Sequence, residues 1–179
     1  MNSIKKLKNI ILDLDLTLIC SIEINDRSNI DSSLEYKEMK NYYKIYSRPH
    51  LQTFLSYIFS NYNVSVWTAA SKDYAMFVIK KFILDPDPTR KIQWIFFSYH
   101  CEESKKSTGF SKKIDFLKKD CKIKNITTNN SLIIDDNMDV YDCQKDNCYL
   151  IKPFECQSKG SSSDTELMRL VEYLKTKAF

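Results

Sequence analysis

Two acidic side chains directly follow an apolar run near the start of the chain. Residues 10–12 are Ile-Ile-Leu, and Asp13 and Asp15 come next, separated by one residue. On an extended segment, residues i and i+2 point to the same side, so the two carboxylates would lie close together. Such like charges repel each other unless a cation or a shared proton compensates them. The spacing suits either an acidic turn or a cation-assisted site, in which one carboxylate attacks phosphorus and the other handles a proton.

Polar groups also end two later apolar runs. Thr68 ends one of them, and Asp135 and Asp136 end another. A lysine pair, Lys112 and Lys113, lies between them in the sequence. In a doubly wound sheet the carboxyl ends of the parallel strands line one crevice. We therefore expect the acids, the hydroxyl and a lysine to meet there, as a phosphoryl-transfer site would require.

Patterns typical of strands and of helices alternate along the sequence. This alternation predicts an α/β fold with a central parallel sheet that helices cover on both faces. After the first strand, strands are expected at residues 41–48, 64–68, 92–98, 132–134 and 149–151. Helices are expected to begin at Pro49, Ser71, Ser111 and Asp164, with a helical turn at residues 138–144. We expect residues 1–179 to form one domain with a minimal cap or insertion.

Two polar stretches carry neither pattern and are expected to be irregular. Residues 21–40 would form a long loop or irregular hairpin over the end of the first strand, and residues 100–109 a mobile loop. The large side chains of Trp67 and Trp94 are expected in the core. Tyr74 is expected on the core face of the second helix.

The composition excludes some classes of site. The 179 residues are 43% hydrophobic and 28% charged, which is typical of a globular domain. Only two glycines are present, so neither a Walker loop nor a Rossmann glycine loop can be written, and phosphate chemistry would use carboxylates, hydroxyls, lysines and a metal. The net charge of +4 tolerates a phosphorylated partner but does not call for nucleic acid.

The six cysteines are scattered and form no C-x-x-C pair. This favours reduced thiols, and hence a cytoplasmic or nuclear location. The apolar runs are all shorter than the roughly 18 residues that a membrane span needs, so we expect no membrane partner.

At this point the chain resembles a known family. The haloacid dehalogenase superfamily combines a D-x-D-x-T motif with a Ser/Thr, a Lys and an acidic motif, in that order. Within it, the FCP/SCP-type phosphatases (NLI-interacting-factor-like) are the most similar, and these act on the C-terminal domain of RNA polymerase II. LDLDLTLICS, YSRPHLQTFL, VSVWTAASKDYA and LIIDDNMDVYD resemble their motifs, with His50 in place of a usual glycine. The likeness spans about residues 9–174.

The resemblance implies roles for the acids. Asp13 would be the nucleophile that forms an aspartyl-phosphate. Asp15 would protonate the leaving oxygen and then activate water. Mg²⁺ would be bound by the Asp13 carboxylate, the Asp15 backbone carbonyl and Asp136.

It also implies roles for the remaining motif residues. Thr68 would hydrogen-bond the phosphoryl oxygens, and a lysine near Asp135 would neutralise them and steady the nucleophile. Lys112 matches the family's lysine motif best, but the neighbouring Lys113 is an alternative. Thr17 would support the first-motif loop rather than react.

The implied function is a Mg²⁺-dependent phosphoserine/phosphothreonine protein phosphatase. Its substrate would be a phosphoprotein or phosphopeptide, with the RNA polymerase II C-terminal repeats as the family's example. The short connection between Phe82 and Lys112 leaves little room for a large cap, and an open crevice favours a peptide. The alternatives are a phosphatase for small molecules or nucleic-acid ends, and a catalytically silent binding module. Retention of Asp13, Asp15 and Asp136 argues against the silent module.

Overall fold

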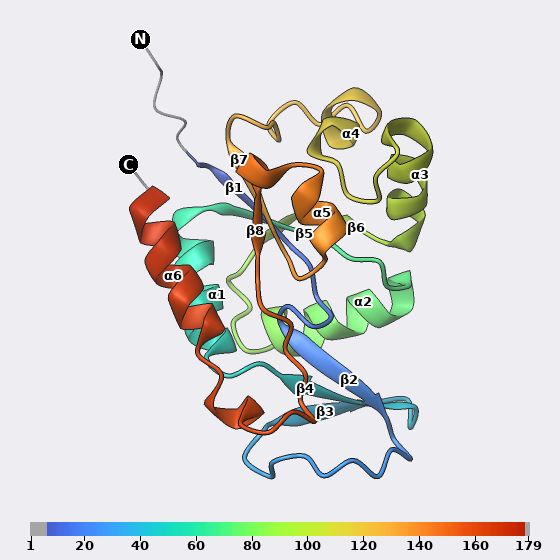
Figure 1. The fold of residues 1–179 in the computed structure, drawn as a ribbon, viewed down its shortest axis with the longest axis vertical. Coiled ribbons are helices and arrows are strands. Elements are labelled where there is room, and N and C mark those ends of the chain that lie inside the picture. The colour runs from blue at the N-terminus through green and yellow to red at the C-terminus, as the bar shows by residue number, and fades with distance from the viewer. Residues whose placement is uncertain (1–6, 178–179) are drawn as a thin grey trace.

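A five-stranded parallel sheet forms the centre of the computed structural model, which describes residues 7–177 (Figure 1). Its strands lie in the order β6-β5-β1-β7-β8. They are β1 (Asn9–Leu12), β5 (Asn63–Trp67), β6 (Ile92–Phe96), β7 (Ser131–Asp135) and β8 (Cys148–Leu150). The apolar strand β1 is buried throughout because it pairs with β5 on one side and β7 on the other. The predicted parallel sheet is confirmed.

Helices cover both faces of this sheet. One face is covered by α1 (Leu51–Asn61), α6 (Glu166–Lys177) and α2 (Lys72–Val78), which continues as the π-helix η1 (Ile79–Leu84). The other face is covered by α3 (Ser98–Thr108), α4 (Ile114–Lys119) and α5 (Met138–Asp142). Short 3-10 helices lie at Lys145–Asn147 and Ser161–Ser163. Because side chains alternate along a strand, Ile10 and Leu12 enter the first core and Ile11 enters the second.

A second, antiparallel sheet follows β1 in the chain. Its strands are β2 (Ile19–Glu23), β3 (Tyr36–Met39) and β4 (Tyr43–Ser47), in the order β2-β4-β3. The expectation of an irregular segment at residues 21–40 was therefore wrong at both ends. Strand β3 lies at the edge of its sheet, and three of its four residues are exposed, so it lacks the apolar alternation by which a strand is recognised.

Residues 100–109 were also predicted wrongly, because all but Gly109 belong to helix α3. Only Cys101 and Ser104 of this helix are buried, so its apolar face is too narrow to be seen in the sequence. Gly109 ends the helix in the left-handed conformation, with φ at 83°.

The two tryptophans differ. Trp67 is fully buried as expected, whereas 44% of Trp94 is exposed. Trp94 lies on β6, the edge strand of the parallel sheet, where a side chain has a neighbouring strand on one side only.

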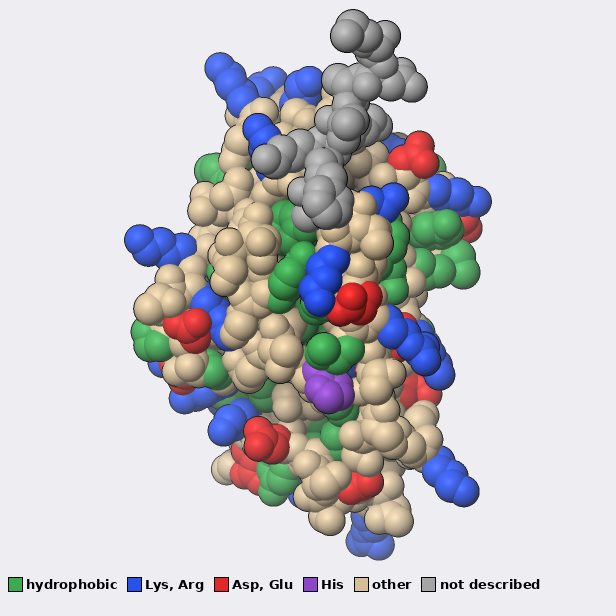
Figure 2. All heavy atoms as spheres, turned by 90° about the vertical axis from the view of Figure 1, so that its left-hand side faces the viewer, with side chains coloured by type: hydrophobic (Ala, Val, Ile, Leu, Met, Phe, Trp, Pro, Cys, Tyr) green, Lys and Arg blue, Asp and Glu red, His purple; other side chains and the backbone are tan. Residues whose placement is uncertain are grey.

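The surface carries charges of both signs. Figure 2 shows basic and acidic side chains interspersed over the face that includes α6, in keeping with the small net charge. Among residues 7–177, no helix has the length and apolar character needed to cross a membrane.

One buried ion pair joins the segments around the two sheets. The guanidinium of Arg48, which follows β4, is paired with the Asp164 carboxylate through two hydrogen bonds of 2.9 Å. It also donates to the backbone carbonyls of Thr17, at 3.0 Å, and Lys152, at 2.8 Å. Arg48 thus links β4, the loop after β1 and the segment before α6.

We expect Arg48→Met to lower the free energy of unfolding by about 3 kcal/mol, because it leaves a largely buried carboxylate and two carbonyls without their donor. Urea unfolding measures the loss. The matched control is Asp85→Asn, which breaks exposed pairs with Lys80 and Lys81 and should leave the urea midpoint almost unchanged. Equal losses for the two variants would contradict this account.

Candidate active site

The carboxyl ends of β1, β5 and β7 meet at a small cavity of about 200 Å³. It is lined by Asp13, Asp15, Thr68, Ala69, Ala70, Ser111, Lys112, Asp135, Asp136, Asn137 and Val140. A larger cavity, of about 780 Å³, lies between β3 and the start of α1. We place the candidate site in the smaller cavity because the acids and the lysine that phosphoryl transfer needs line that one.

Lys112 joins the acids of two strands. Its Nζ lies 2.6 Å from Oδ1 of Asp13, after β1, and 2.7 Å from Oδ2 of Asp135, at the end of β7. Burial alone would lower the pKa of Lys112, but the charges of Asp13 and Asp135 outweigh it and hold this pKa above its usual range. The ammonium is therefore charged and held between the two carboxylates.

Lys113 points elsewhere. It precedes the first residue of α4, and its ammonium donates to the backbone carbonyl of Cys143 and lies 5.6 Å from the centre of the Phe110 ring. The helix begins at Ile114 and not at Ser111, so the expectation of a Ser111 cap was wrong. Lys113 has extended backbone after the turn at Ser111 and Lys112, and of the two lysines only Lys112 hydrogen-bonds to the acids.

A buried glutamine, which the sequence did not single out, fixes this part of the backbone. Gln144 Nε2 donates to the carbonyl of Lys112 at 2.5 Å, and its Oε1 accepts from the N–H of Ile114 at 3.1 Å. Gln144 follows α5, so the lysine is positioned by a residue 32 positions further along the chain. No local pattern marks this contact.

Asp13, Asp135 and Asp136 form one acidic cluster. Each offers a carboxylate oxygen, and these oxygens lie within 4.8 Å of one another. Burial raises the pKa of Asp13 to about 7, with Asp135 and Asp136 adding to the rise and Lys112 opposing it. Burial and the charge of Asp135 also raise the pKa of Asp136. One lysine does not balance this concentration of acids.

The donor set fits a hard divalent cation. Asp135 accepts from Lys112 and, through Oδ1, from the N–H of Asn137 at 2.9 Å, so protein groups already occupy both its oxygens. Asp13 and Asp136 each have one oxygen in a hydrogen bond within the protein. Carboxylate and carbonyl oxygens are the ligands that Mg²⁺ prefers.

Asp15 has a tyrosine partner that the sequence does not reveal. Its Oδ1 accepts a hydrogen bond of 2.5 Å from the hydroxyl of Tyr74. Burial raises the pKa of Asp15, and the Tyr74 hydrogen bond opposes that rise. Tyr74 packs against the core as expected, and because α2 starts just beyond the end of β5, its hydroxyl also reaches Asp15 beside the crevice. The polar tip of a tyrosine near a strand end could have indicated this position.

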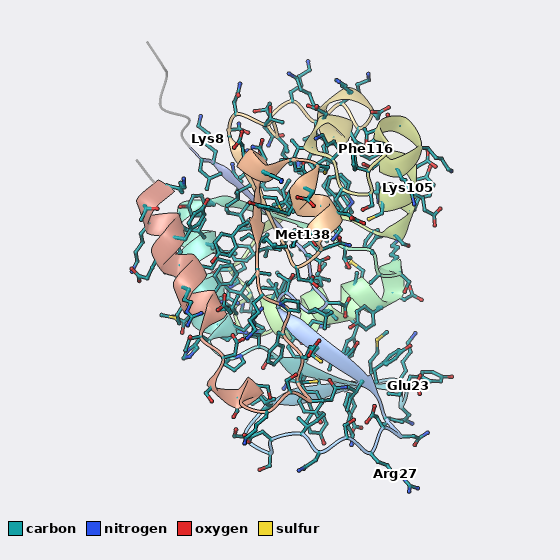
Figure 3. The ribbon with its side chains drawn as sticks, in the orientation of Figure 1. Lys8, Glu23, Arg27, Lys105, Phe116 and Met138 are labelled. Carbon is teal, nitrogen blue, oxygen red and sulfur yellow. The ribbon has the colours of Figure 1, made fainter. Side chains whose placement is uncertain are left out.

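The two threonines have different surroundings. Thr68 is buried and lines the cavity, and its Oγ1 accepts from the N–H of Ala70 at 3.1 Å. Thr17 is fully buried outside the lining and donates to Asp136 Oδ1 at 3.3 Å. Leu16, between Asp15 and Thr17, adopts the left-handed conformation, with φ at 58°. In Figure 3, Met138 marks the start of α5, the helix that follows the acids of β7.

Comparison with known proteins gives one family. A family model described as NLI interacting factor-like phosphatase matches residues 8–178. A CTD phosphatase-like protein of Invertebrate iridescent virus 6 is 44% identical over 177 residues, covering 94% of this chain and 97% of the relative. A CTD phosphatase-like protein of Invertebrate iridescent virus 3 is 40% identical over 182 residues, covering 96% of this chain and 97% of the relative.

A solved structure has the same fold. The chain is similar to the fission yeast RNA polymerase II CTD phosphatase Fcp1, with a TM-score of 0.56 and 22% identity. The match covers 96% of this chain but only 50% of the Fcp1 chain, so this chain spans about half of that protein's solved length.

The lysine bridge predicts different outcomes for two neighbouring substitutions. Lys112→Met leaves Asp13 and Asp135 buried without a counter-charge, and we expect the free energy of unfolding to fall by about 3 kcal/mol. Lys113→Met is the matched control and should cost less than about 1 kcal/mol. Urea unfolding at neutral pH measures both. A larger loss for Lys113→Met would show that the bridge is misassigned.

Proposed function

The chain belongs to the NLI interacting factor-like phosphatase family, and we propose that it is a Mg²⁺-dependent phosphoserine/phosphothreonine protein phosphatase acting through an aspartyl-phosphate. The observation that carries this proposal is the position of Lys112 between Asp13 and Asp135. Such a bridge fixes the nucleophile beside a permanent positive charge. We extend the proposal to residues 1–179 acting as one phosphatase domain.

Asp13 is the proposed nucleophile. Its carboxylate is held by Lys112 through Oδ1, which fixes the orientation of the group. A carboxylate oxygen attacks the phosphorus of the ester, and the bond to the leaving oxygen breaks. The leaving oxygen takes a proton from the carboxyl of Asp15 and departs as the free hydroxyl of serine or threonine.

In the second step Asp15 acts as a general base. As a carboxylate it accepts a proton from a water molecule, whose oxygen attacks the phosphorus of the aspartyl-phosphate. The bond between phosphorus and the Asp13 oxygen breaks, phosphate leaves, and Asp15 is protonated again. The buried setting that raises the pKa of Asp15 suits the acid step, and the Tyr74 hydrogen bond holds the carboxyl in one orientation.

Thr68 and Lys112 stabilise the phosphoryl group during both steps. The Thr68 hydroxyl donates to one phosphoryl oxygen, and the Lys112 ammonium compensates the charge on the others. Both side chains line the cavity.

The metal completes the charge balance. The carboxylates of Asp13 and Asp136, with the backbone carbonyl of Asp15, would hold Mg²⁺, as the oxygen donors of the site favour. When bound, it supplies positive charge for the phosphoryl oxygens. Asp135 keeps Lys112 in place and is not assigned to the metal.

A phosphoprotein substrate is favoured by the size of the site. The cavity of about 200 Å³ is smaller than the roughly 300–1,000 Å³ of pockets that enclose a small molecule. It has room for a phosphoryl group, while the remainder of the substrate would lie on the surface. The CTD phosphatase-like names of the viral relatives make the RNA polymerase II C-terminal repeats the first peptides to test. Six free cysteines support an intracellular, reducing location, cytoplasmic or nuclear.

Hydrolysis of p-nitrophenyl phosphate tests the chemistry. We expect turnover with Mg²⁺, none with EDTA, and a loss of about a thousandfold or more in Asp13→Asn, because an amide is a poor nucleophile and a poor metal ligand. Asp139→Asn removes an exposed carboxylate outside the site and should keep full activity. Absence of turnover in folded, Mg²⁺-supplied wild type would favour a binding module.

Substrate competition tests the class of substrate. With p-nitrophenyl phosphate as reporter, we expect phosphoserine peptides of the polymerase repeat to have a kcat/KM at least about tenfold above that of nucleoside monophosphates, because contacts outside the cavity add binding energy. A preference for nucleotides or for phosphorylated nucleic-acid ends would overturn the protein-phosphatase assignment but not the aspartate chemistry.

A further inference from the structure

Two cysteines far apart in the sequence contact each other. Cys20 lies on β2, and Cys156 lies between β8 and α6, 136 residues later. Both are buried. The backbone N–H of Cys156 donates to Cys20 Sγ at 3.2 Å, and Cys156 Sγ lies 4.0 Å from the carbonyl oxygen of Cys20. These cysteines have no part in the phosphoryl chemistry proposed above.

One exposed side chain contacts both thiols. Oε1 of Gln157 lies 3.8 Å from the sulfur of Cys20 and 3.8 Å from that of Cys156. Gln157 itself is exposed, as is Glu155 on the other side of Cys156. The pair lies in a small apolar cluster with Ile22, Leu34, Tyr46 and Phe154 but also contacts this surface side chain, so a small oxidant would reach the sulfurs by displacing Gln157.

The two thiols are chemically unequal. The neighbouring Cys156 side chain and the hydrogen bond from the Cys156 N–H lower the pKa of Cys20 against the opposing effect of burial. The proximity of Cys20, together with burial, raises the pKa of Cys156. Because the thiolate is the reactive form, Cys20 is the sulfur that reacts first, and Cys156 is the partner beside it.

We propose that Cys20 and Cys156 are a modification site at which a peroxide forms a reversible disulfide. The Cys20 thiolate attacks one oxygen of hydrogen peroxide, the O–O bond breaks, and the sulfur becomes a sulfenic acid as hydroxide leaves and is protonated to water. Cys156 sulfur then attacks the sulfenic sulfur, the S–S bond forms, and hydroxide leaves with the thiol proton as a second water. Two thiols are oxidised and one peroxide is reduced.

The disulfide would join two segments that contact the loop after β1, which carries Asp13 and Asp15. Phe154, two residues before Cys156, donates its N–H to the carbonyl of Leu16 at 2.7 Å. Cys20 follows that loop on β2. A covalent link across 136 residues also restricts the unfolded chain and so stabilises the folded one.

The test uses the full chain with hydrogen peroxide and then dithiothreitol. Intact-mass spectrometry should show loss of two hydrogens with peroxide and their return with dithiothreitol. Trypsin alone leaves Cys148 and Cys156 in one peptide, so a glutamyl endopeptidase that cuts after Glu155 is added. The linked peptides should contain Cys20 and Cys156. Oxidation should raise the melting temperature by about 10 °C.

Matched variants separate this pair from the other thiols. Cys156→Ser should abolish the link and the melting shift, whereas Cys121→Ser, which removes a partly exposed thiol, should keep both. If Cys156→Ser does not fold, the peptide map of the wild type still decides. A link between other cysteines, irreversible oxidation of Cys20, or no change at all would overturn the proposal. None of these readouts depends on phosphatase activity.

Discussion

A lysine buried between two carboxylates imposes the main constraint on this structure. Lys112 can remain charged in the interior only while Asp13 and Asp135 stay within hydrogen-bond distance, and the acids tolerate each other only because of the lysine. The acids belong to adjacent central strands, β1 and β7, whose register sets their separation. The lysine comes from the segment before α4, and Gln144 holds that segment from the end of α5. The sheet, the short helices α4 and α5, and Gln144 thus together fix the position of one ammonium group.

The same site has an excess of negative charge, which suits it to bind a cation. Four carboxylates line a cavity that contains one lysine, and burial raises the pKa values of Asp13, Asp15 and Asp136. A folded chain would not gain stability from such a cluster by itself, because each buried charge has lost its hydration. Binding a divalent cation together with a phosphoryl group would relieve the repulsion among the carboxylates. The unliganded site therefore lowers the stability of the fold, but the same carboxylates favour ligand binding.

The sequence predicted those features that depend on the periodicity of neighbouring residues. The apolar run before Asp13 and the acids after β7 follow strand periodicity, so the parallel sheet and the meeting of strand ends could be predicted. Residue patterns alone could not separate Lys112, which the family resemblance favoured, from Lys113, because the difference depends on where α4 starts and on the distant Gln144. Helix periodicity predicts correctly that Tyr74 packs against the core, but it does not reveal the hydrogen bond to Asp15. Strand β3 and helix α3 were missed because both are largely solvent-exposed and lack a clear apolar period.

The position of β1 in the middle of the parallel sheet has a consequence for how the molecule opens. Hydrogen exchange in proteins reports local openings, and central strands are released last. Asp13 and Asp135 extend from such strands, whereas Lys112 and Tyr74 come from segments outside the sheet, which by the same rule would open at lower cost. A partial opening would therefore separate the lysine and the tyrosine from acids that stay in place. The site would lose its charge balance while the sheet remained intact. The activity of the site and the global stability of the protein would then depend on different cooperative units.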